Sequence, residues 1–191
     1  MKTSIQSLAI ITLTLINFGL LTISEAVVPP PDGGYPGFNT AEGQSALSAL
    51  TTGIGNTAIG WRSLFSNTDG SFNTAVGAGT LVLNVGNQAS GEGTQNTAVG
   101  TAALLSNTTG ADNTATGSTA LLHNTTGNHN TASGGLALFL NTTGSSNVAI
   151  GHAALANNTS GNFNIAVGAT APVPKSRRRL TALLSGTKAQ M

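Results

Sequence analysis

The pentapeptide Asn-x-Ala-x-Gly recurs along this chain at an almost constant interval. Successive copies are 17 residues apart, except for one step of 23 residues. A period of this length indicates a stack of similar units that bury their apolar side chains only against their neighbours. Such a chain is poorly suited to a site that needs unlike residues from distant segments. The copies begin at Asn39, Asn56, Asn73, Asn96, Asn113, Asn130, Asn147 and Asn164.

Numbering each unit from its asparagine gives the template N-T-A-x-G-x-x-A-L-x-x-N-T-T-G-x-x. Position 3 is alanine and position 5 is glycine in every copy, and position 9 is leucine wherever a copy reaches it. Two short extended pieces, separated by corners where glycine and asparagine accept positive φ, fit this template. The frequent glycines leave no uninterrupted helix of useful length.

The sequence therefore predicts an all-β fold, a parallel β-solenoid (β-roll) of about eight 17-residue coils over residues 39–168. Coils ~4.8 Å apart form a rod of roughly 35–40 Å. Identical positions lie above one another, so alanine at position 3 and leucine at position 9 form inward columns, each buried leucine contributing about 1.5–3 kcal/mol. The predicted core column is Leu47, Leu64, Leu81, Leu104, Leu121, Leu138 and Leu155.

The eight asparagines at position 1 are predicted to stack into a ladder of amide-to-amide hydrogen bonds. Position 12, asparagine in most units, is expected to do the same. A role as simple turn residues is compatible with the ladder, and both are favoured over ligand contact. Asn107, Asn124, Asn141, Asn157 and Asn158 also match the N-glycosylation pattern, which we attribute to turns written Asn-Thr-Thr-Gly.

The 23-residue step contains Asn87-Gln88-Ala89-Ser90-Gly91, a weak extra copy of the pentapeptide. We interpret the step as 14 plus 9 residues. One turn would lose three residues after Asn84, and a partial coil or protruding loop would follow through Glu92. A tolerated defect is favoured over a binding loop.

Residues 1–26 have the pattern of a signal peptide, with Lys2 before a largely apolar run and small residues at the end. The alternative is a retained membrane anchor, but the run is short for a spanning helix. Cleavage after Ala26 predicts a secreted or outer-cell-surface protein without a transmembrane anchor. The chain has no cysteine, so stacking alone must stabilise it.

Two further segments flank the repeats. Residues 27–38 are rich in proline and glycine and predict a leader or N-terminal cap, in which Tyr35 and Phe38 cover the first coil or remain free. Residues 169–191 form a basic tail that we expect to be disordered, with docking on an anionic membrane or nucleic acid as the alternative. The abrupt end of the repeat also suits a truncated fragment of a larger surface adhesin.

The sequence predicts no catalytic residues, no cofactor and no metal site. Residues 39–168 carry five charged side chains and no basic stripe, which argues against binding nucleic acid. His123, His129 and His152 occupy different unit positions, so stacking does not align them. No histidine or carboxylate pair has the spacing of metal ligands, and no nucleophile or phosphate-loop motif occurs.

Asn-Thr-Ala-Val-Gly units alternating with Ala-Leu-rich pieces resemble the head repeats of trimeric autotransporter adhesins. The resemblance spans residues 39–168 and is most evident at Asn73 and Asn96, where the motif is complete. It implies a left-handed parallel β-roll, a homotrimer, and adhesion to extracellular matrix, host or other cell surfaces. The units here are longer than the usual head repeat because of the Asn-Thr-Thr-Gly segment.

We therefore expect a structural or adhesive repeat protein, not an enzyme, that binds through a repetitive face. The alternative is an ice-binding solenoid, because position 2 would align hydroxyl and methyl groups in one surface row. Val148 and Ile165 end that row, and threonine is also a good strand former. The threonine row is Thr40, Thr57, Thr74, Thr97, Thr114 and Thr131.

Overall fold

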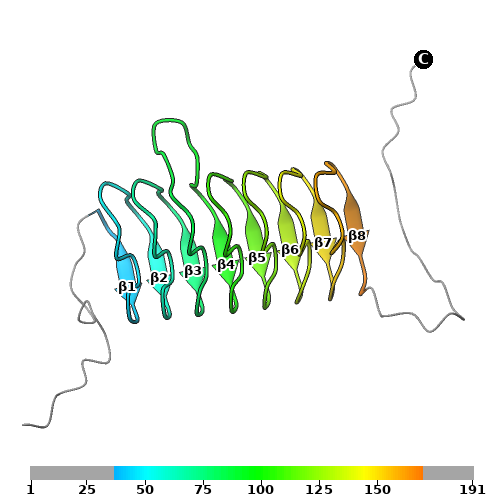
Figure 1. Ribbon diagram of the computed structural model, residues 1–191, viewed down its shortest axis with the longest axis horizontal. Coiled ribbons are helices and arrows are strands. Elements are labelled where there is room, and N and C mark those ends of the chain that lie inside the picture. The colour runs from blue at the N-terminus through cyan, green and yellow to red at the C-terminus, as the bar shows by residue number, and fades with distance from the viewer. Residues whose placement is uncertain (1–36, 170–191) are drawn as a thin grey trace, which may run out of the picture.

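The computed structural model describes residues 37–169, which form one rod of stacked coils (Figure 1). Each coil contributes a single three-residue strand, and no helix occurs in this range. The strand begins directly after the position-1 asparagine, where β-branched threonine, valine or isoleucine precedes the alanine. The strands are β1 (Thr40–Glu42), β2 (Thr57–Ile59), β3 (Thr74–Val76), β4 (Thr97–Val99), β5 (Thr114–Thr116), β6 (Thr131–Ser133), β7 (Val148–Ile150) and β8 (Ile165–Val167).

All eight strands pair in sequence order to form one parallel sheet. Equivalent positions lie side by side, so that Thr40 pairs with Thr57 and Ala58 pairs with Ala75. The register is also kept across the irregular step, where Thr74 pairs with Thr97. The prediction of a parallel β-solenoid of about eight 17-residue coils is thus confirmed.

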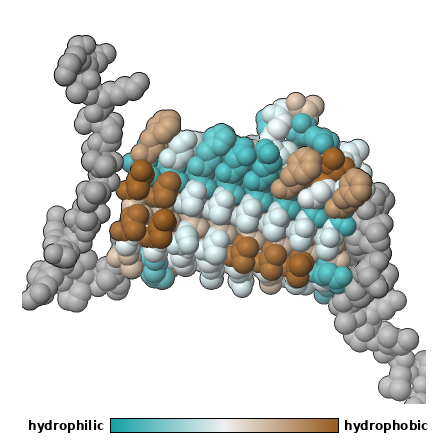
Figure 2. Space-filling model, turned by 180° about the vertical axis from the view of Figure 1, so that it is seen from behind, coloured by the Kyte–Doolittle hydropathy of each residue, from teal (hydrophilic) through white to brown (hydrophobic). Residues whose placement is uncertain are grey.

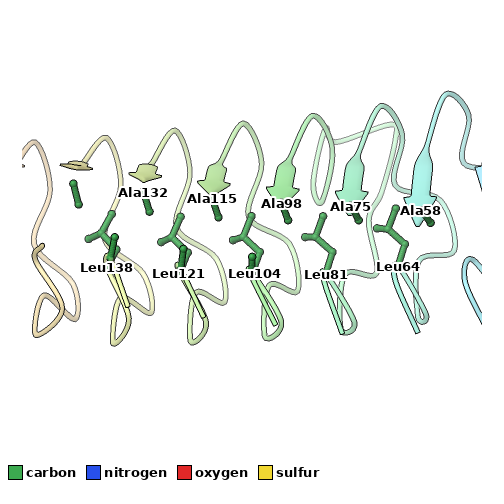
Figure 3. Packing of buried hydrophobic residues seen from close by; sticks show 14 of the residues in the cluster. Ala58, Leu64, Ala75, Leu81, Ala98, Leu104, Ala115, Leu121, Ala132 and Leu138 are labelled. Carbon is green, nitrogen blue, oxygen red and sulfur yellow. The ribbon is translucent and has the colours of Figure 1, made fainter. Parts of the chain in front are cut away.

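The core consists of the position-3 alanine column facing the position-9 leucine column, with buried alanine at position 8 in most coils (Figure 3). Alanine at position 3 points inward because its neighbours at positions 2 and 4 point to the other face of the strand. Its small side chain leaves room for the leucine of the facing segment. Leu47 is 6% exposed and Leu155 is half-buried, since they end the column. The fully buried leucines are Leu64, Leu81, Leu104, Leu121 and Leu138.

The segment that carries these leucines is not the second extended piece that we expected. Positions 6 to 11 form turns, and positions 7 and 9 have positive φ in each coil, for example 53° at Arg62 and 50° at Leu64. This left-handed conformation costs a leucine about 1–2 kcal/mol. Burial of the same side chain contributes a similar amount, so the stack holds a conformation that the isolated segment would not keep.

The positive φ values keep the coils hydrogen-bonded where no strand exists. The backbone amide of Arg62 donates to the carbonyl of Gln44 in the preceding coil at 2.9 Å. Two residues later, the amide of Leu64 donates to the carbonyl of Thr80 in the following coil at 3.0 Å. The amide at position 7 is thus satisfied by the preceding coil and the amide at position 9 by the following coil.

The corners at positions 5 and 15, which need a positive φ or leave no room for a Cβ, are occupied by glycine and not by asparagine. None of the asparagines among residues 37–169 has a positive φ, so that part of our turn prediction is wrong. Gly100 at position 5 has a φ of 126°, and a Cβ there would lie 2.7 Å from the Gly117 carbonyl. Gly110 at position 15 has no positive φ, yet its Cβ would lie 2.5 Å from the Gly127 carbonyl oxygen. The first glycine meets a conformational and a steric demand, and the second a purely steric one.

The irregular step is a complete coil with six extra residues, so the protruding loop through Glu92 that we predicted is present, whereas the shortened turn and the partial coil are not. Asn73 and Asn84 both donate to the carbonyl of Gly93 at 2.9 Å, which makes Gly93 the position-15 glycine of this coil. Residues 87–92, here called the insertion loop, therefore project between positions 14 and 15 (Figure 1). A loop can leave and rejoin a coil there without disturbing the ladders on either side.

Most predictions for the chain ends lie outside the described residues, namely those for the signal peptide, Tyr35 and residues 170–191. Phe38 is described and is 93% exposed, so the expectation that it covers the first coil is wrong. It continues the column of position 17, which points away from the stack, and shares a positive φ with Phe72 and Phe163. Among residues 37–169 there is no helix with the length and apolarity needed to cross a bilayer.

Candidate functional site

The position-1 asparagines form a continuous hydrogen-bonded ladder inside the rod. The backbone amide and Nδ2 of Asn113 both donate to Oδ1 of Asn96 at 3.1 Å, and Nδ2 also donates to the Gly127 carbonyl at 2.8 Å. Asn39 donates to Gly53, and Asn164 makes the two bonds to Asn147. The full set of three bonds recurs at Asn56, Asn73, Asn96, Asn130 and Asn147.

A second ladder runs through position 12 and meets the first at the position-15 glycines. Nδ2 of Asn124 donates to Oδ1 of Asn107 at 2.8 Å and to the Gly127 carbonyl at 3.0 Å. That carbonyl also accepts from Asn113 in the first ladder. The side-chain amides are thus engaged within the protein, so neither ladder offers a ligand site. Each bond contributes about 1 kcal/mol net. The second ladder comprises Asn67, Asn84, Asn107, Asn124, Asn141 and Asn158.

The outward side chains at positions 2 and 4 of β1 to β8 form a regular surface, here called the strand face (Figure 2). In the threonine row at position 2, Thr40 and Thr114 are exposed and the other four threonines are half-buried. Val148 and Ile165 continue this row over β7 and β8. With their position-4 neighbours they form an apolar patch at one end of the rod (Figure 2).

Sequence reasoning missed the second column of the strand face, at position 4. It is uncharged except for Glu42, and Ile59, Ile150 and Val167 are 41%, 43% and 62% exposed. The signal was available, because residues on either side of an inward alanine must share the outward face. The column is Glu42, Ile59, Val76, Val99, Thr116, Ser133, Ile150 and Val167.

Two sets of threonines in the rod differ in how their hydroxyls are used. At position 13 the hydroxyl donates to the carbonyl of the next coil, as from Thr108 to Thr125 at 2.9 Å and from Thr125 to Thr142 at 3.0 Å. Within residues 37–169, the hydroxyls of the threonine row at position 2 make no hydrogen bond to the protein. The strand face therefore offers its hydroxyls to solvent or to a ligand.

Residues 90–92 of the insertion loop line one side of a hollow of about 600 Å³. Glu92 of the loop, Gln95 at its base, and Asp112 and Asn128 from the next two coils contribute to the lining. This is a place where unlike residues from several segments converge, in contrast to the repeated faces. We favoured a tolerated defect at this step, so the hollow was not expected from the sequence.

Asp69 anchors the insertion loop to the preceding coil. Its Oδ2 accepts a hydrogen bond from the backbone amide of Gln88 at 3.0 Å, and its Oδ1 accepts one from the Thr52 hydroxyl. The hydroxyl of Thr52, and next the amide of Gln88, lower the pKa of Asp69 below 3.8, because both bonds favour the ionised carboxylate. The insertion loop is therefore anchored to an ionised carboxylate that hydrogen bonds stabilise.

In the described part of the chain, no three histidine, aspartate or glutamate side chains are grouped so that they could hold a metal ion. His129 Nδ1 lies 3.8 Å from Asp112 Oδ2, whereas His123 packs edge-on against the ring of Phe139. Arg62 is the only arginine or lysine among residues 37–169, and its guanidinium lies over the rings of Phe65 and Trp61. The predictions of no enzyme, cofactor or metal remain predictions.

The described residues thus form four notable features: two internal asparagine ladders, the strand face and the hollow. Comparisons of the chain with protein-family models, with curated proteins and with solved structures found no match. A functional assignment therefore depends on the geometry of these surfaces and on the resemblance of the repeat.

Proposed function

We propose that this chain is a secreted or cell-surface adhesive rod, non-catalytic, comparable to the head repeats of trimeric autotransporter adhesins. The observation that supports this most is the in-register strand face. It repeats threonine and β-branched side chains at ~4.8 Å intervals over eight coils, with Glu42 as the one charge. Adhesive contact with extracellular matrix or a cell surface then needs no specialised pocket.

A repetitive face of this kind binds by multivalency. Each threonine or valine contributes a small contact, but once one coil is bound its neighbours are held close to the same surface. Linking weak contacts in this way raises overall affinity by roughly 10²–10⁴ without any new interaction. A rigid rod pays little ordering entropy on binding, because its side chains are already arranged by the stack.

Charge placed on the strand face tests this proposal. We expect Thr97→Lys with Thr131→Lys to weaken adhesion of the whole chain to surfaces coated with fibronectin or collagen and to bare polystyrene. The matched control is Leu83→Lys with Leu140→Lys, which adds the same charge at exposed leucines outside the strand face. Equal adhesion by both double variants, or no adhesion by the unmodified chain, would contradict the proposal.

Because the repeat resembles the head repeats of trimeric autotransporter adhesins, the proposal also includes a homotrimer and export from the cell. Three chains side by side would multiply the number of strand faces meeting a surface. Sedimentation equilibrium of the whole chain is expected to give three times the monomer mass, and a strict monomer would remove this part of the analogy. Mass spectrometry of exported protein is expected to find Val27 as the first residue.

Ice binding is the second candidate, and the free hydroxyls of the threonine row favour it. Position-13 hydroxyls are consumed by the stack, whereas position-2 hydroxyls stand in a row at the strand spacing of ~4.8 Å with β-branched neighbours. A flat array of this kind orders water at regular intervals. Val148 and Ile165 shorten the row to six threonines.

Thermal hysteresis and ice-recrystallisation assays decide this candidate. If the strand face binds ice, Thr114→Lys at the middle of the row abolishes most of the activity. Thr143→Lys, at an exposed position outside the strand face, is the control and leaves the activity unchanged. Absence of activity in the unmodified chain would end the ice-binding hypothesis and leave adhesion untouched.

A further inference from the structure

The hollow beside the insertion loop is built where the repeat is interrupted. Six extra residues enter one coil, and their C-terminal part, residues 90–92, lines the hollow together with residues of the two coils that follow. The hollow of about 600 Å³ is lined by Glu92 of the loop and by Gln95, Asp112 and Asn128 of three successive coils. Stacking alone brings Gln95, Asp112 and Asn128 together, and the insertion loop adds Glu92 as a further wall.

The wall that the loop supplies is already ordered by its own hydrogen bonds. The amide of Asn87 donates to the carbonyl of Glu92 at 2.7 Å and closes the loop, while Oδ1 of Asn87 accepts from the amide of Ala89 at 3.0 Å. The Thr94 hydroxyl donates to the carbonyl of Gly91 at 2.7 Å. With the Asp69 anchor, these bonds fix the loop before a ligand arrives, which lowers the entropic cost of binding.

The lining has the chemistry of a receptor for hydroxyl groups. The carboxylates of Glu92 and Asp112 accept hydrogen bonds, and the amide of Gln95 both donates and accepts. Oδ1 of Asn128 is occupied by the amide of Ala111 at 2.7 Å, which leaves its N–H groups to donate. The two carboxylates disfavour an anionic ligand, since no basic side chain lines the hollow.

We propose that the hollow binds a neutral saccharide of one or two rings. Its volume falls within the ordinary range of ligand pockets, about 300–1,000 Å³. The sugar hydroxyls donate to Glu92 and Asp112 and accept from Asn128. The site is separate from the strand face, so it goes beyond the proposed adhesive function and does not depend on it.

Ligand-observed NMR and calorimetry on the whole chain test this site with glucose, galactose, mannose, N-acetylglucosamine and their common disaccharides. We expect at least one of these sugars to bind with a dissociation constant on the order of 1 mM. Asp112→Asn and Glu92→Gln are expected to weaken binding about tenfold or more, because each loses a charge-assisted hydrogen bond. Glu42→Gln, a carboxylate change on β1, is the control and leaves binding unchanged.

Deletion of residues 87–92 provides an independent test, because it joins Gly86 to Gly93 as positions 14 and 15 of a regular coil. The variant is expected to keep its circular dichroism spectrum and lose sugar binding. If no sugar of the panel binds the unmodified chain, or if the deletion variant binds as tightly, the proposal is wrong. Either result leaves adhesion by the strand face to be judged by its own lysine variants.

Discussion

Asn96 donates two hydrogen bonds to one oxygen, Oδ1 of Asn73, although 23 positions separate the two residues. The backbone amide lies 3.0 Å and the side-chain amide 3.2 Å from that oxygen. Asn113 lies 17 positions after Asn96, and its backbone amide and side-chain amide both donate to Oδ1 of Asn96 at 3.1 Å. The ladder is thus the same with or without the insertion loop, so the coil is defined by its hydrogen bonds to neighbouring coils and not by its length.

The leucine column is expected to carry much of the stability of the rod. Leu104→Ala, in the middle of the column, should lower the free energy of unfolding by about 2–5 kcal/mol, because neighbouring coils cannot close the cavity. Leu155→Ala at the half-buried end should cost clearly less. Urea denaturation of both variants checks this, and equal losses would show that the column is not the core.

Replacing a ladder asparagine by its nearest isostere should be severe. Asn113→Asp removes the donors to Asn96 and Gly127 and leaves a buried carboxylate facing carbonyl oxygens. We expect a loss of at least about 3 kcal/mol at neutral pH. The loss should diminish in acid, where the carboxyl group takes up a proton. Asn157→Asp, at an exposed position, is the control for urea denaturation.

The position-15 glycine is predicted to tolerate no side chain. A Cβ on Gly110 would overlap the Gly127 carbonyl oxygen and Oδ1 of Asn107, both fixed by the stack, so Gly110→Ala should cost about 1–3 kcal/mol or more. Gly79→Ala is the matched change, because its Cβ has space and the equivalent Ala102 shows the same positive φ. A thermal melt that shifts equally for the two variants would refute the steric explanation.

Acid is expected to release the insertion loop. The pKa of Asp69 is lowered by its hydrogen bonds from Thr52 and Gln88, so the contribution of its carboxylate is fully present above the ordinary value of 3.8. That contribution is lost as pH falls through the lowered pKa. The amide resonance of Gln88 should therefore titrate with a midpoint below 3.8, and Asp69→Asn should abolish the titration. A midpoint at or above 3.8 would contradict this link.

Much of the architecture follows from the repeat alone. Identical residues at a fixed spacing stack in register, which places Leu64 beside Leu81 and Thr57 beside Thr74. No knowledge of the path of the coil is needed for that inference, because translation along one axis maps each unit onto the next. The inward direction of Ala58 likewise follows from the two-residue period of a strand.

The path of each coil was decided by tertiary structure. Local preference predicts an extended segment at Ala103 and Leu104, whereas the rod places Leu104 at a φ of 52° because only that turn brings its side chain inside while its amide reaches the next coil. The hollow at Glu92 and Asp112 depends on the exit point of the insertion loop, which three-dimensional bonds to Gly93 determine. Periodicity specifies what is repeated. Contacts between coils decide the rest. They offset the strain of the leucines with positive φ, and they determine where the insertion loop leaves the coil.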